Sequence, residues 1–521
     1  MKITHGPVPL LHDYLQQAAR EYSNKVALVC MKQRITYSEL DTRSNALGHF
    51  LVAAGVKRGD RVVIFADNTV ETVISFWAVL KANAVVSIVN PLTKSDKLSY
   101  LLEDCRPAAL ITDAHLHSVF AAPARSCHHL RCIILSGAID DMRLADLPHA
   151  THWDSAITSG TRKTPPTRSS IDIDIAAIIY TSGSTGDPKG VMLTHRNMLA
   201  ACTSISSYLE LQEDDVILCV LPLAFDYGLY QMIMAFHTGA RLILERSFAF
   251  PAQILNILVA EGVTGFPGVP TIFSILAELK SLKDYDITKI RFVTNTAAAL
   301  PVKHILMLRD VFPEARIYSM YGLTECKRCT YLPPKDIDLK PSSVGIAIPN
   351  TEMWIVDEDG NKVGCDTVGQ LVIRGATVMK GYWEKPEATD RKLKPGPLPG
   401  EQVLYTGDFC KMDKEGYLYF VGRMDDIIKS RGEKIAPKEV ENILMNIPGV
   451  KEAAVIGVPD NILGQAVKAF VVFEDGIILT EKHLQNECQR QLENFMIPKH
   501  IVVMPSLPKT DTGKIKKTGL F

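Results

Sequence analysis

The sequence predicts an α/β protein. A large N-terminal domain, made of two mixed α/β sheet subdomains and a β-rich subdomain, precedes a small mobile α+β C-terminal domain. Three observations support this prediction. Short apolar runs alternate with helix-like stretches up to residue 330, short strands with Gly or Asp turns follow, and the pattern changes again after Gly422. Alternating strands and helices are typical of largely parallel sheets, and 521 residues suffice for several domains of roughly 100–200 residues.

Each expected element follows from a local pattern of apolar residues bounded by turn residues. In the first part we expect strands at 61–65, 108–112, 131–135, 175–180, 216–220 and 241–244, and helices at 37–54, 69–82, 94–103, 196–209 and 252–261. The β-rich part has expected strands at 351–357, 369–374, 403–408 and 417–421. Beyond it we expect helices at 437–445 and 481–493 and strands at 453–458 and 466–473, so the predicted domains are 1–422 and 423–521.

Charge and composition exclude some classes of partner. The chain has 57 basic and 58 acidic residues and a net charge of −1, which gives no general electrostatic case for nucleic acid or an anionic membrane. Residues 72–89 are interrupted by Lys81 and Asn83, so we expect a buried helix and a strand there and no membrane insertion. Eleven cysteines without a visible signal peptide predict reduced thiols and a cytoplasmic protein.

The most informative stretch is YTSGSTGDPKGV at residues 180–191, which follows an apolar strand. Glycines let the backbone approach a ligand closely, and backbone N–H groups, hydroxyls and an ammonium can then surround phosphate oxygens. Lys189 is followed by Gly190, so this is not the Walker A spacing. A flexible surface loop is the alternative for an arbitrary Ser/Gly run. The expected phosphate-binding residues are Thr181, Ser182, Gly183, Ser184, Thr185, Gly186 and Lys189.

Carboxylates next to turn residues mark further candidates. Asp226 follows Phe225 and a buried strand, where it either caps the next helix or faces a ligand. Glu325 ends the string YGLTE, in which a carboxylate after a tight glycine turn can hold Mg²⁺ beside phosphates and Thr324 can hydrogen-bond them. Asp408 ends YTGD, and a carboxylate on such a turn can accept both ribose hydroxyls. Ordinary surface turns are the alternative for each string taken alone.

Two motifs fall at and beyond the predicted domain boundary. In GRMDDIIK, Arg423 can bind ribose or phosphate, and Asp425 can absorb a backbone rotation between domains. In PKTDTGK, Lys514 can bring positive charge to a reacting carboxylate and phosphate, although a lysine near a C-terminus is usually solvated tail.

These strings occur in the order typical of the AMP-forming adenylating enzymes, and the chain resembles that superfamily from about residue 37 to 517. GYWEKPEATD and GRMDDIIKSRGEKIAPKEVE add to the resemblance. The superfamily contains acyl-CoA synthetases, luciferases and peptide-synthetase adenylation domains. The resemblance implies that MgATP activates a carboxylate as an acyl-adenylate with release of pyrophosphate, and that a thiol then expels AMP.

The resemblance also implies roles for single residues. The loop 181–189 would hold the β- and γ-phosphates, Thr324 the α-phosphate, and Glu325 the Mg²⁺. Lys514 would bridge the reacting carboxylate and phosphate in the transition state. The remaining implied roles are adenine stacking by Tyr321, ribose binding by Asp408 and Arg423, a hinge at Asp425, and a loop around Arg431 and Gly432 that faces the incoming pantetheine.

The substrate pocket implied by peptide-synthetase domains would comprise Asp226, Tyr227, Tyr230, Pro267, Val293, Asn295, Met320, Arg328 and Cys329. A buried carboxylate needs a cationic partner, so Asp226 suggests an amino-acid ammonium. The strings AFDYGLYQ and GLTECKRCTYLPP resemble stand-alone L-proline:carrier-protein ligases of natural-product pathways, and also acyl-CoA ligases.

Three hypotheses follow. The first is an amino-acid ligase, for proline above all, that serves the phosphopantetheine of a separate acyl or peptidyl carrier protein. The second is an acyl-CoA synthetase for a short or medium-chain acid with CoA as the acceptor, and the third is a non-catalytic binding protein. We expect no carrier domain after Lys514, so in either enzyme the thiol comes from another molecule.

Overall fold

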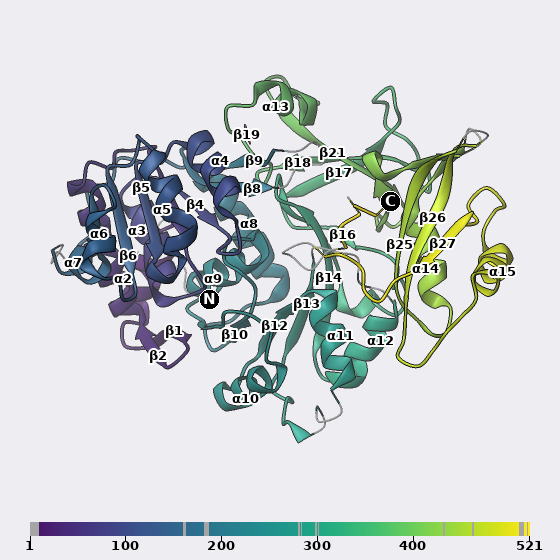
Figure 1. Ribbon diagram of the computed structural model, residues 1–521, viewed down its shortest axis with the longest axis horizontal. Helices are drawn as coiled ribbons and strands as arrows, with labels where there is room; N and C mark the ends of the chain where they lie inside the picture. Colours follow the sequence, from purple (N-terminus) through teal and green to yellow (C-terminus); the bar gives the residue numbers. More distant parts are fainter. Residues whose placement is uncertain are drawn as a thin grey trace.

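The computed structural model describes residues 10–159, 163–181, 187–279, 282, 284–296, 300, 302–430, 433–460, 463–509, 515–517 and 519–520. Within them the chain forms four sheets and the helices that cover them (Figure 1). Mixed α/β sheets in a large N-terminal part, with a smaller C-terminal part, confirm the predicted fold class.

The first sheet lies at the left of Figure 1 and is parallel from β7 to β8, with antiparallel β9 and β19 at its other edge. Its order is β19-β9-β8-β4-β3-β5-β6-β7. The strands are β3 (Arg61–Phe65), β4 (Val85–Val89), β5 (Ala109–Asp113), β6 (Cys132–Ser136), β7 (Ala150–His152), β8 (Ile175–Thr181), β9 (Lys189–Thr194) and β19 (Gly381–Tyr382).

The second sheet also has a parallel centre, flanked by antiparallel strands at both edges. Its order is β16-β15-β14-β13-β12-β10-β11-β1-β2. The strands are β1 (Val26–Cys30), β2 (Gln33–Thr36), β10 (Val216–Cys219), β11 (Arg241–Leu244), β12 (Gly265–Gly268), β13 (Phe292–Asn295), β14 (Arg316–Leu323), β15 (Lys327–Leu332) and β16 (Ile346–Ala347).

Helices cover these two sheets because their apolar faces need burial. Within the described residues the longer ones are α1 (Asp13–Glu21), α2 (Tyr37–Ala53), α3 (Val70–Lys81), α4 (Ser95–Cys105), α5 (His117–Ser126), α8 (His195–Leu209), α9 (Asp226–Thr238), α10 (Pro251–Glu261), α11 (Pro270–Glu278) and α12 (Val302–Val311). One continuous core joins the two sheets through α2, α3, α8 and α9, so they form one body. Capping boxes start α2 at Thr36 and α8 at Thr194.

The two remaining sheets are smaller and largely antiparallel. The third contains β17 (Thr351–Val356), β18 (Gly369–Gly375), β20 (Leu393–Pro395), β21 (Gln402–Met412) and β22 (Leu418–Arg423), with the short helix α13 (Pro386–Lys392) before β20. The fourth contains β23 (Ile428–Ser430), β24 (Glu433–Ile435), β25 (Val450–Asp460), β26 (Gly464–Phe473) and β27 (His500–Val503), with α14 (Pro437–Asn446) and α15 (Glu481–Gln491). The fourth sheet has its own apolar core.

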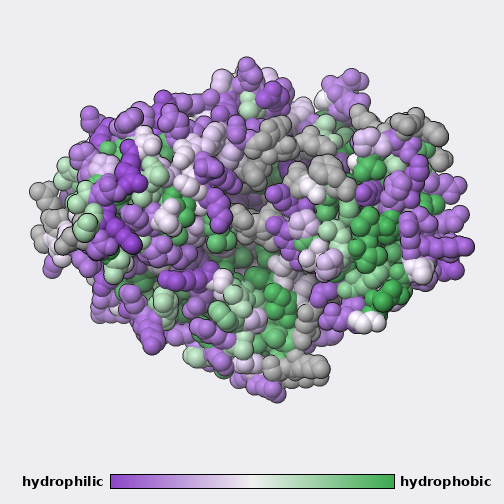
Figure 2. Space-filling view, viewed as in Figure 1, coloured by the Kyte–Doolittle hydropathy of each residue, from purple (hydrophilic) through white to green (hydrophobic). Residues whose placement is uncertain are grey.

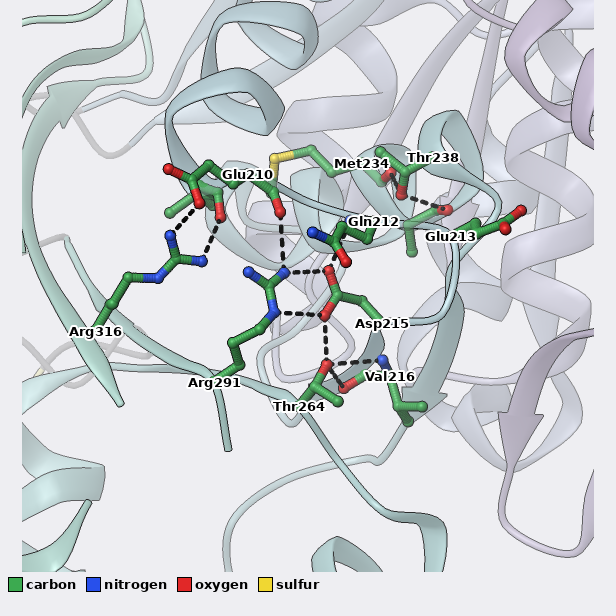
Figure 3. Close-up of polar contacts among 12 residues, drawn as sticks. Glu210, Gln212, Glu213, Asp215, Val216, Met234, Thr238, Thr264, Arg291 and Arg316 are labelled. Carbon is green, nitrogen blue, oxygen red and sulfur yellow. Dashed lines mark hydrogen bonds and ion pairs between the residues drawn. The ribbon is translucent and has the colours of Figure 1, made fainter. Parts of the chain in front are cut away.

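A polar cluster links the amino-terminal ends of strands in the second sheet, and Figure 3 shows it around Asp215. The buried Asp215 carboxylate pairs with Arg291 at 2.5 Å and accepts a hydrogen bond from Thr264 Oγ1 at 2.7 Å. Arg316 pairs with Glu210 beside it. Since these residues precede or begin β10, β12, β13 and β14, the cluster fixes the strands whose other ends reach the site described next.

Candidate active site

The segment between β8 and β9 carries the predicted phosphate loop. These strands are antiparallel neighbours, with Thr181 opposite Lys189. Ser182, Gly183, Ser184, Thr185 and Gly186 lie outside the described residues. The ladder therefore places the first and last of the predicted phosphate-binding residues side by side. Figure 2 shows the surface hollowed beside β8.

A tyrosine that the motif analysis did not single out joins Lys189 to Glu325. The Tyr382 hydroxyl donates to Glu325 Oε1 at 2.7 Å, and the Lys189 ammonium lies 5.8 Å from the centre of the Tyr382 ring. Burial, together with the charge of Glu325, raises the pKa of Tyr382, so its hydroxyl stays a donor. Tyr382 belongs to GYWEKPEATD, so the signal was present in a string that we noted without assigning a role.

Backbone hydrogen bonds hold this arrangement. Tyr382 in β19 pairs with Val191 of β9, and the Trp383 N–H donates to the Gly190 carbonyl at 2.7 Å. The Met379 N–H donates to the Glu325 carbonyl, also at 2.7 Å. Segments around residues 190, 325 and 380 are thus fastened to one another, although more than fifty residues separate any two of them.

Thr324 and Glu325 lie in the hairpin turn between β14 and β15. Gly322 is required there, because a Cβ on it would lie 1.8 Å from the Lys327 carbonyl oxygen. The turn leads into strand β15 and not into a helix. A carboxylate on a tight turn suits Mg²⁺, which is usually held by one or two carboxylates and substrate phosphates. Among the described residues no group of three His, Cys, Asp or Glu is arranged to hold a metal alone.

Asp408 lies in the interior of a strand, which corrects the expectation of a turn. Strand β21 runs on to Met412, because residues 408–412 pair with β22. The Asp408 carboxylate is buried and accepts hydrogen bonds from the Tyr321 hydroxyl and from Arg423 Nε, the latter at 3.3 Å. The three predicted adenosine-binding residues are therefore linked through Asp408.

Electrostatics connect this trio to Glu325. Burial raises the pKa of Asp408, and Arg423 and the Tyr321 hydroxyl oppose that shift. Partial burial lowers the pKa of Arg423, but the carboxylates of Asp408 and Glu325 raise it by more, so the net shift is upward. The guanidinium therefore lies within the field of both carboxylates.

The predicted hinge and thiol-facing residues come next along the chain, after β22. Asp425 lies in a short 3₁₀ turn, η4 (Met424–Asp426), between β22 of the third sheet and β23 of the fourth. Arg431, Gly432 and Lys514 fall outside the described residues.

The predicted substrate-pocket residues come from α9 and four neighbouring strands. Pro267 and Asn295 lie at the carboxyl ends of β12 and β13, the edge of a parallel sheet where ligands bind, and Val293 and Met320 lie earlier in β13 and β14. The Tyr227 hydroxyl of α9 donates to the Thr294 carbonyl at 2.7 Å and so attaches the helix to this edge. Asp226, Tyr230, Arg328 and Cys329 complete the set on α9 and β15.

Asp226 does not cap its helix. It is the first residue of α9, and the capping position belongs to Phe225, which makes no side-chain cap. Its Oδ2 lies 3.9 Å from Arg328 Nη1, and the Arg328 guanidinium lies 4.6 Å from the centre of the Tyr227 ring. The protein itself thus supplies a cationic partner for this carboxylate.

Comparisons with known proteins agree with this geometry. A family model for AMP-binding enzymes matches residues 15–383, and one for the AMP-binding enzyme C-terminal domain matches residues 439–514. The long-chain-fatty-acid–CoA ligase of Escherichia coli O157:H7 is 32% identical over 98% of this chain and 94% of its own length.

Two solved structures are similar over nearly their whole length. ATP-bound MatB from Rhodopseudomonas palustris superposes with a TM-score of 0.87 at 28% identity, covering 98% of each chain. The anthranilate CoA ligase AuaEII in complex with anthranoyl-AMP gives a TM-score of 0.88 at 27% identity, covering all of this chain and 98% of the other.

The chain belongs to the AMP-binding enzymes, the AMP-forming adenylating superfamily. It is an enzyme that uses ATP to adenylate a carboxylic acid. The finer resemblance to L-proline:carrier-protein ligases is not shown by these comparisons. Within the described residues no helix has the length and apolar character that a membrane span requires.

Proposed function

We propose that this enzyme activates a small carboxylic acid with MgATP and transfers the acyl group to the thiol of CoA. The observation that carries the proposal is that Lys189 and Glu325 both contact Tyr382, while Arg423 pairs with Asp408 and lies in the field of Glu325. These residues combine an ammonium, a guanidinium and two carboxylates, which suits a magnesium nucleotide. The names of the relatives, CoA ligases for several different acids, support CoA as the acceptor.

In the first half-reaction a substrate carboxylate oxygen attacks the α-phosphorus of ATP, and the bond to the β-phosphate oxygen breaks to release pyrophosphate. The residues of the loop and Lys189 hold the leaving phosphates, and Thr324 contacts the α-phosphate. Glu325 would hold Mg²⁺, which supplies neutralisation of phosphate charge when bound. Asp408 accepts from the ribose hydroxyls, Arg423 supports it, and Tyr321 lies against the adenine. Positioning and charge stabilisation are the main tasks.

In the second half-reaction the thiol sulfur attacks the acyl carbonyl, the thiol proton is released, and AMP leaves with its electron pair. We propose that the part after Arg423 rotates at Asp425 between the steps. Lys514 then moves away from the adenylate, and the segment of Arg431 and Gly432 turns toward the pantetheine. Motion about a short connecting segment is the hinge type of domain movement. The cysteines are free, which supports action in a reducing compartment such as the cytoplasm.

One observation bears on the alternative, an amino-acid ligase that serves a carrier protein. That hypothesis rested on Asp226, which would need a substrate ammonium as its partner. Arg328 already lies 3.9 Å from it, so the geometry favours an acid without an ammonium group. Asp226 still lies in the implied pocket, and the Asp226→Ala variant separates the two hypotheses. It should abolish exchange with amino acids if Asp226 anchors the ammonium, and should spare plain acids.

The test is ATP–pyrophosphate exchange without thiol, across the proteinogenic amino acids and a ladder of straight-chain, aromatic and dicarboxylic acids. We expect exchange with plain acids, and thioester formation once CoA is added. Lys514→Ala should lower exchange by about 100- to 1000-fold while ATP still binds, as the loss of one transition-state donor does. Exchange dominated by proline, with transfer to a carrier protein and none to CoA, would refute the proposal. ATP binding without exchange by any acid would indicate the non-catalytic alternative.

A further inference from the structure

The wall of the candidate substrate pocket between α9 and β15 carries an excess of positive charge. Lys327 and Arg328 are buried, with 1% and 4% of their surfaces exposed. Asp226 is the carboxylate beside them, 3.9 Å from Arg328, and its charge also acts on Lys327. The charge of Glu325 also acts on Lys327, and that carboxylate accepts a hydrogen bond from Tyr382. Among the described carboxylates only Asp226 lies within 4 Å of either cation, and burying an uncompensated charge is costly.

Several donors of this wall have no acceptor. Lys327 Nζ, Arg328 Nε and the Tyr230 hydroxyl are buried and make no hydrogen bond within the part of the chain that the structure describes. The Lys327 ammonium lies 5.0 Å from the centre of the Tyr230 ring, so two of these donors belong to one contact. An aromatic face stabilises a cation but accepts no strong hydrogen bond. Buried polar groups normally have partners, so these donors need an explanation.

Lys81, the other lysine that is buried among the described residues, shows how the fold treats an ammonium that is purely structural. Lys81 Nζ donates to Asp41 Oδ1 at 2.6 Å and to Ser44 Oγ and Asn45 Oδ1 at 2.7 Å. Its charge is matched and its donors are satisfied inside the protein. Lys327 has the same degree of burial and none of these bonds. The difference indicates that the acceptor for Lys327 comes from a ligand.

We infer that the acid activated by this enzyme carries a second carboxylate in its tail, which Lys327 Nζ and Arg328 Nε bind. This inference rests on the proposed function, because that function makes the space between α9 and β15 the acyl pocket. A carboxylate has only acceptors, about four lone-pair sites on two oxygens, and matches several donors at once. Charge-assisted hydrogen bonds of this kind are stronger than neutral ones. The substrate class is therefore a dicarboxylic acid whose near carboxylate reacts with ATP.

The test compares diacids with their monomethyl esters, which keep the shape and remove the charge of one end. Exchange is measured with straight-chain diacids of increasing length and with aromatic diacids, each beside its half-ester. For the diacid of matching length we expect a preference of about 10- to 100-fold in kcat/KM over its half-ester, the range for a hydrogen-bonded charge. Lys327→Met should remove most of that preference, and Lys335→Met, which changes an exposed lysine, should keep it.

The kinetic constants give a readout that a merely structural role would not move. In Lys327→Met the KM for the diacid should rise, while the KM for its half-ester should not.

The outcomes distinguish a failure of the diacid inference from a failure of the proposed function. Exchange with monocarboxylic acids or half-esters, equal to or better than exchange with every diacid, overturns the inference and leaves the proposed function intact. An unchanged preference in Lys327→Met also overturns it. No exchange with any acid overturns the proposed function itself.

Discussion

Replacing Asp215 by alanine should weaken the large body of the protein without touching the site chemistry. The Asp215 carboxylate accepts four hydrogen bonds, from Gln212 N, Thr264 Oγ1, Arg291 Nε and Arg291 Nη2, at 2.8, 2.7, 3.2 and 2.5 Å (Figure 3). Removal of the carboxylate takes an acceptor from each of these donors and leaves the guanidinium without its ionic partner, although Arg291 Nη2 keeps its hydrogen bond to the Glu210 carbonyl. Breaking a buried ion pair costs about 3–5 kcal/mol. Because the Arg291 side chain is 29% exposed, water compensates for part of this loss. We therefore expect the free energy of unfolding to fall by about 2–4 kcal/mol.

The assay is urea unfolding followed by tryptophan fluorescence. A chain with separate cores need not unfold in one step, so a probe confined to one of them is needed. All four tryptophans precede residue 423, at positions 77, 153, 354 and 383, and therefore report on the large part of the chain alone. For Asp215→Ala the urea concentration at the unfolding midpoint should fall, and the dependence of the free energy of unfolding on urea should not change.

Two further variants complete the experiment. Asp214→Ala removes a neighbouring exposed carboxylate and should change the free energy of unfolding by less than about 0.5 kcal/mol. The double variant Asp215→Ala/Arg291→Met removes both charges and should lose less stability than the two single variants together, because it leaves no uncompensated cation. A loss below about 1 kcal/mol for Asp215→Ala, or strict additivity in the double variant, would show that the cluster is solvated and not structural.

The remaining predictions concern α9, the nucleotide site and pH. Gly228→Ala should destabilise the protein by about 1–3 kcal/mol despite the higher helix propensity of alanine, because its Cβ would lie 2.4 Å from the Pro222 carbonyl oxygen. Gly364→Ala, where nothing lies within 4 Å, is the matched control in denaturant unfolding. Asp408→Asn should raise the KM for ATP by about 10- to 100-fold, since an amide replaces the carboxylate proposed to hold the ribose; unchanged ATP kinetics would remove that role. Lys327 loses its proton in the folded state at about pH 8 and in the unfolded state near 10.5. The unfolded chain thus binds more protons in this window, and wild-type stability should rise with pH there relative to Lys327→Met; parallel curves for the two proteins would contradict it.

Much of the fold was predictable because its signals are local. Strands β3 and β11 have the predicted bounds, and α2 ends one residue before the predicted end. An apolar run with turn residues on each side, or a capping box such as that of Thr36 and Glu39, acts within a few residues. Strand β21 exceeded its prediction by four residues at its carboxyl end, because pairing with β22 extends it. That pairing depends on a partner strand that local sequence does not specify.

The candidate site also combines features that local sequence encodes with features that depend on distant segments. The phosphate loop is one continuous string, so its chemistry is legible in the sequence, and so is membership of the adenylating superfamily. Tyr382 and Lys327 were missed, because nothing local shows that the first joins Lys189 to Glu325 or that the second is buried without an acceptor. The role expected of Asp226 depended on a missing cation, and Arg328, a hundred residues away, lies beside it.

The sequence by itself determined the class of fold, the ATP-dependent chemistry and most of the residues proposed to carry it, because short motifs encode each of these within a few residues. Only the tertiary structure decided which charges meet. It buried Asp408 in a strand between Tyr321 and Arg423, and it buried Lys327 and Arg328 with Asp226 as the one described carboxylate within 4 Å of either cation. The electrostatic balance of a pocket depends on distances and burial, and those are set by how distant segments pack together.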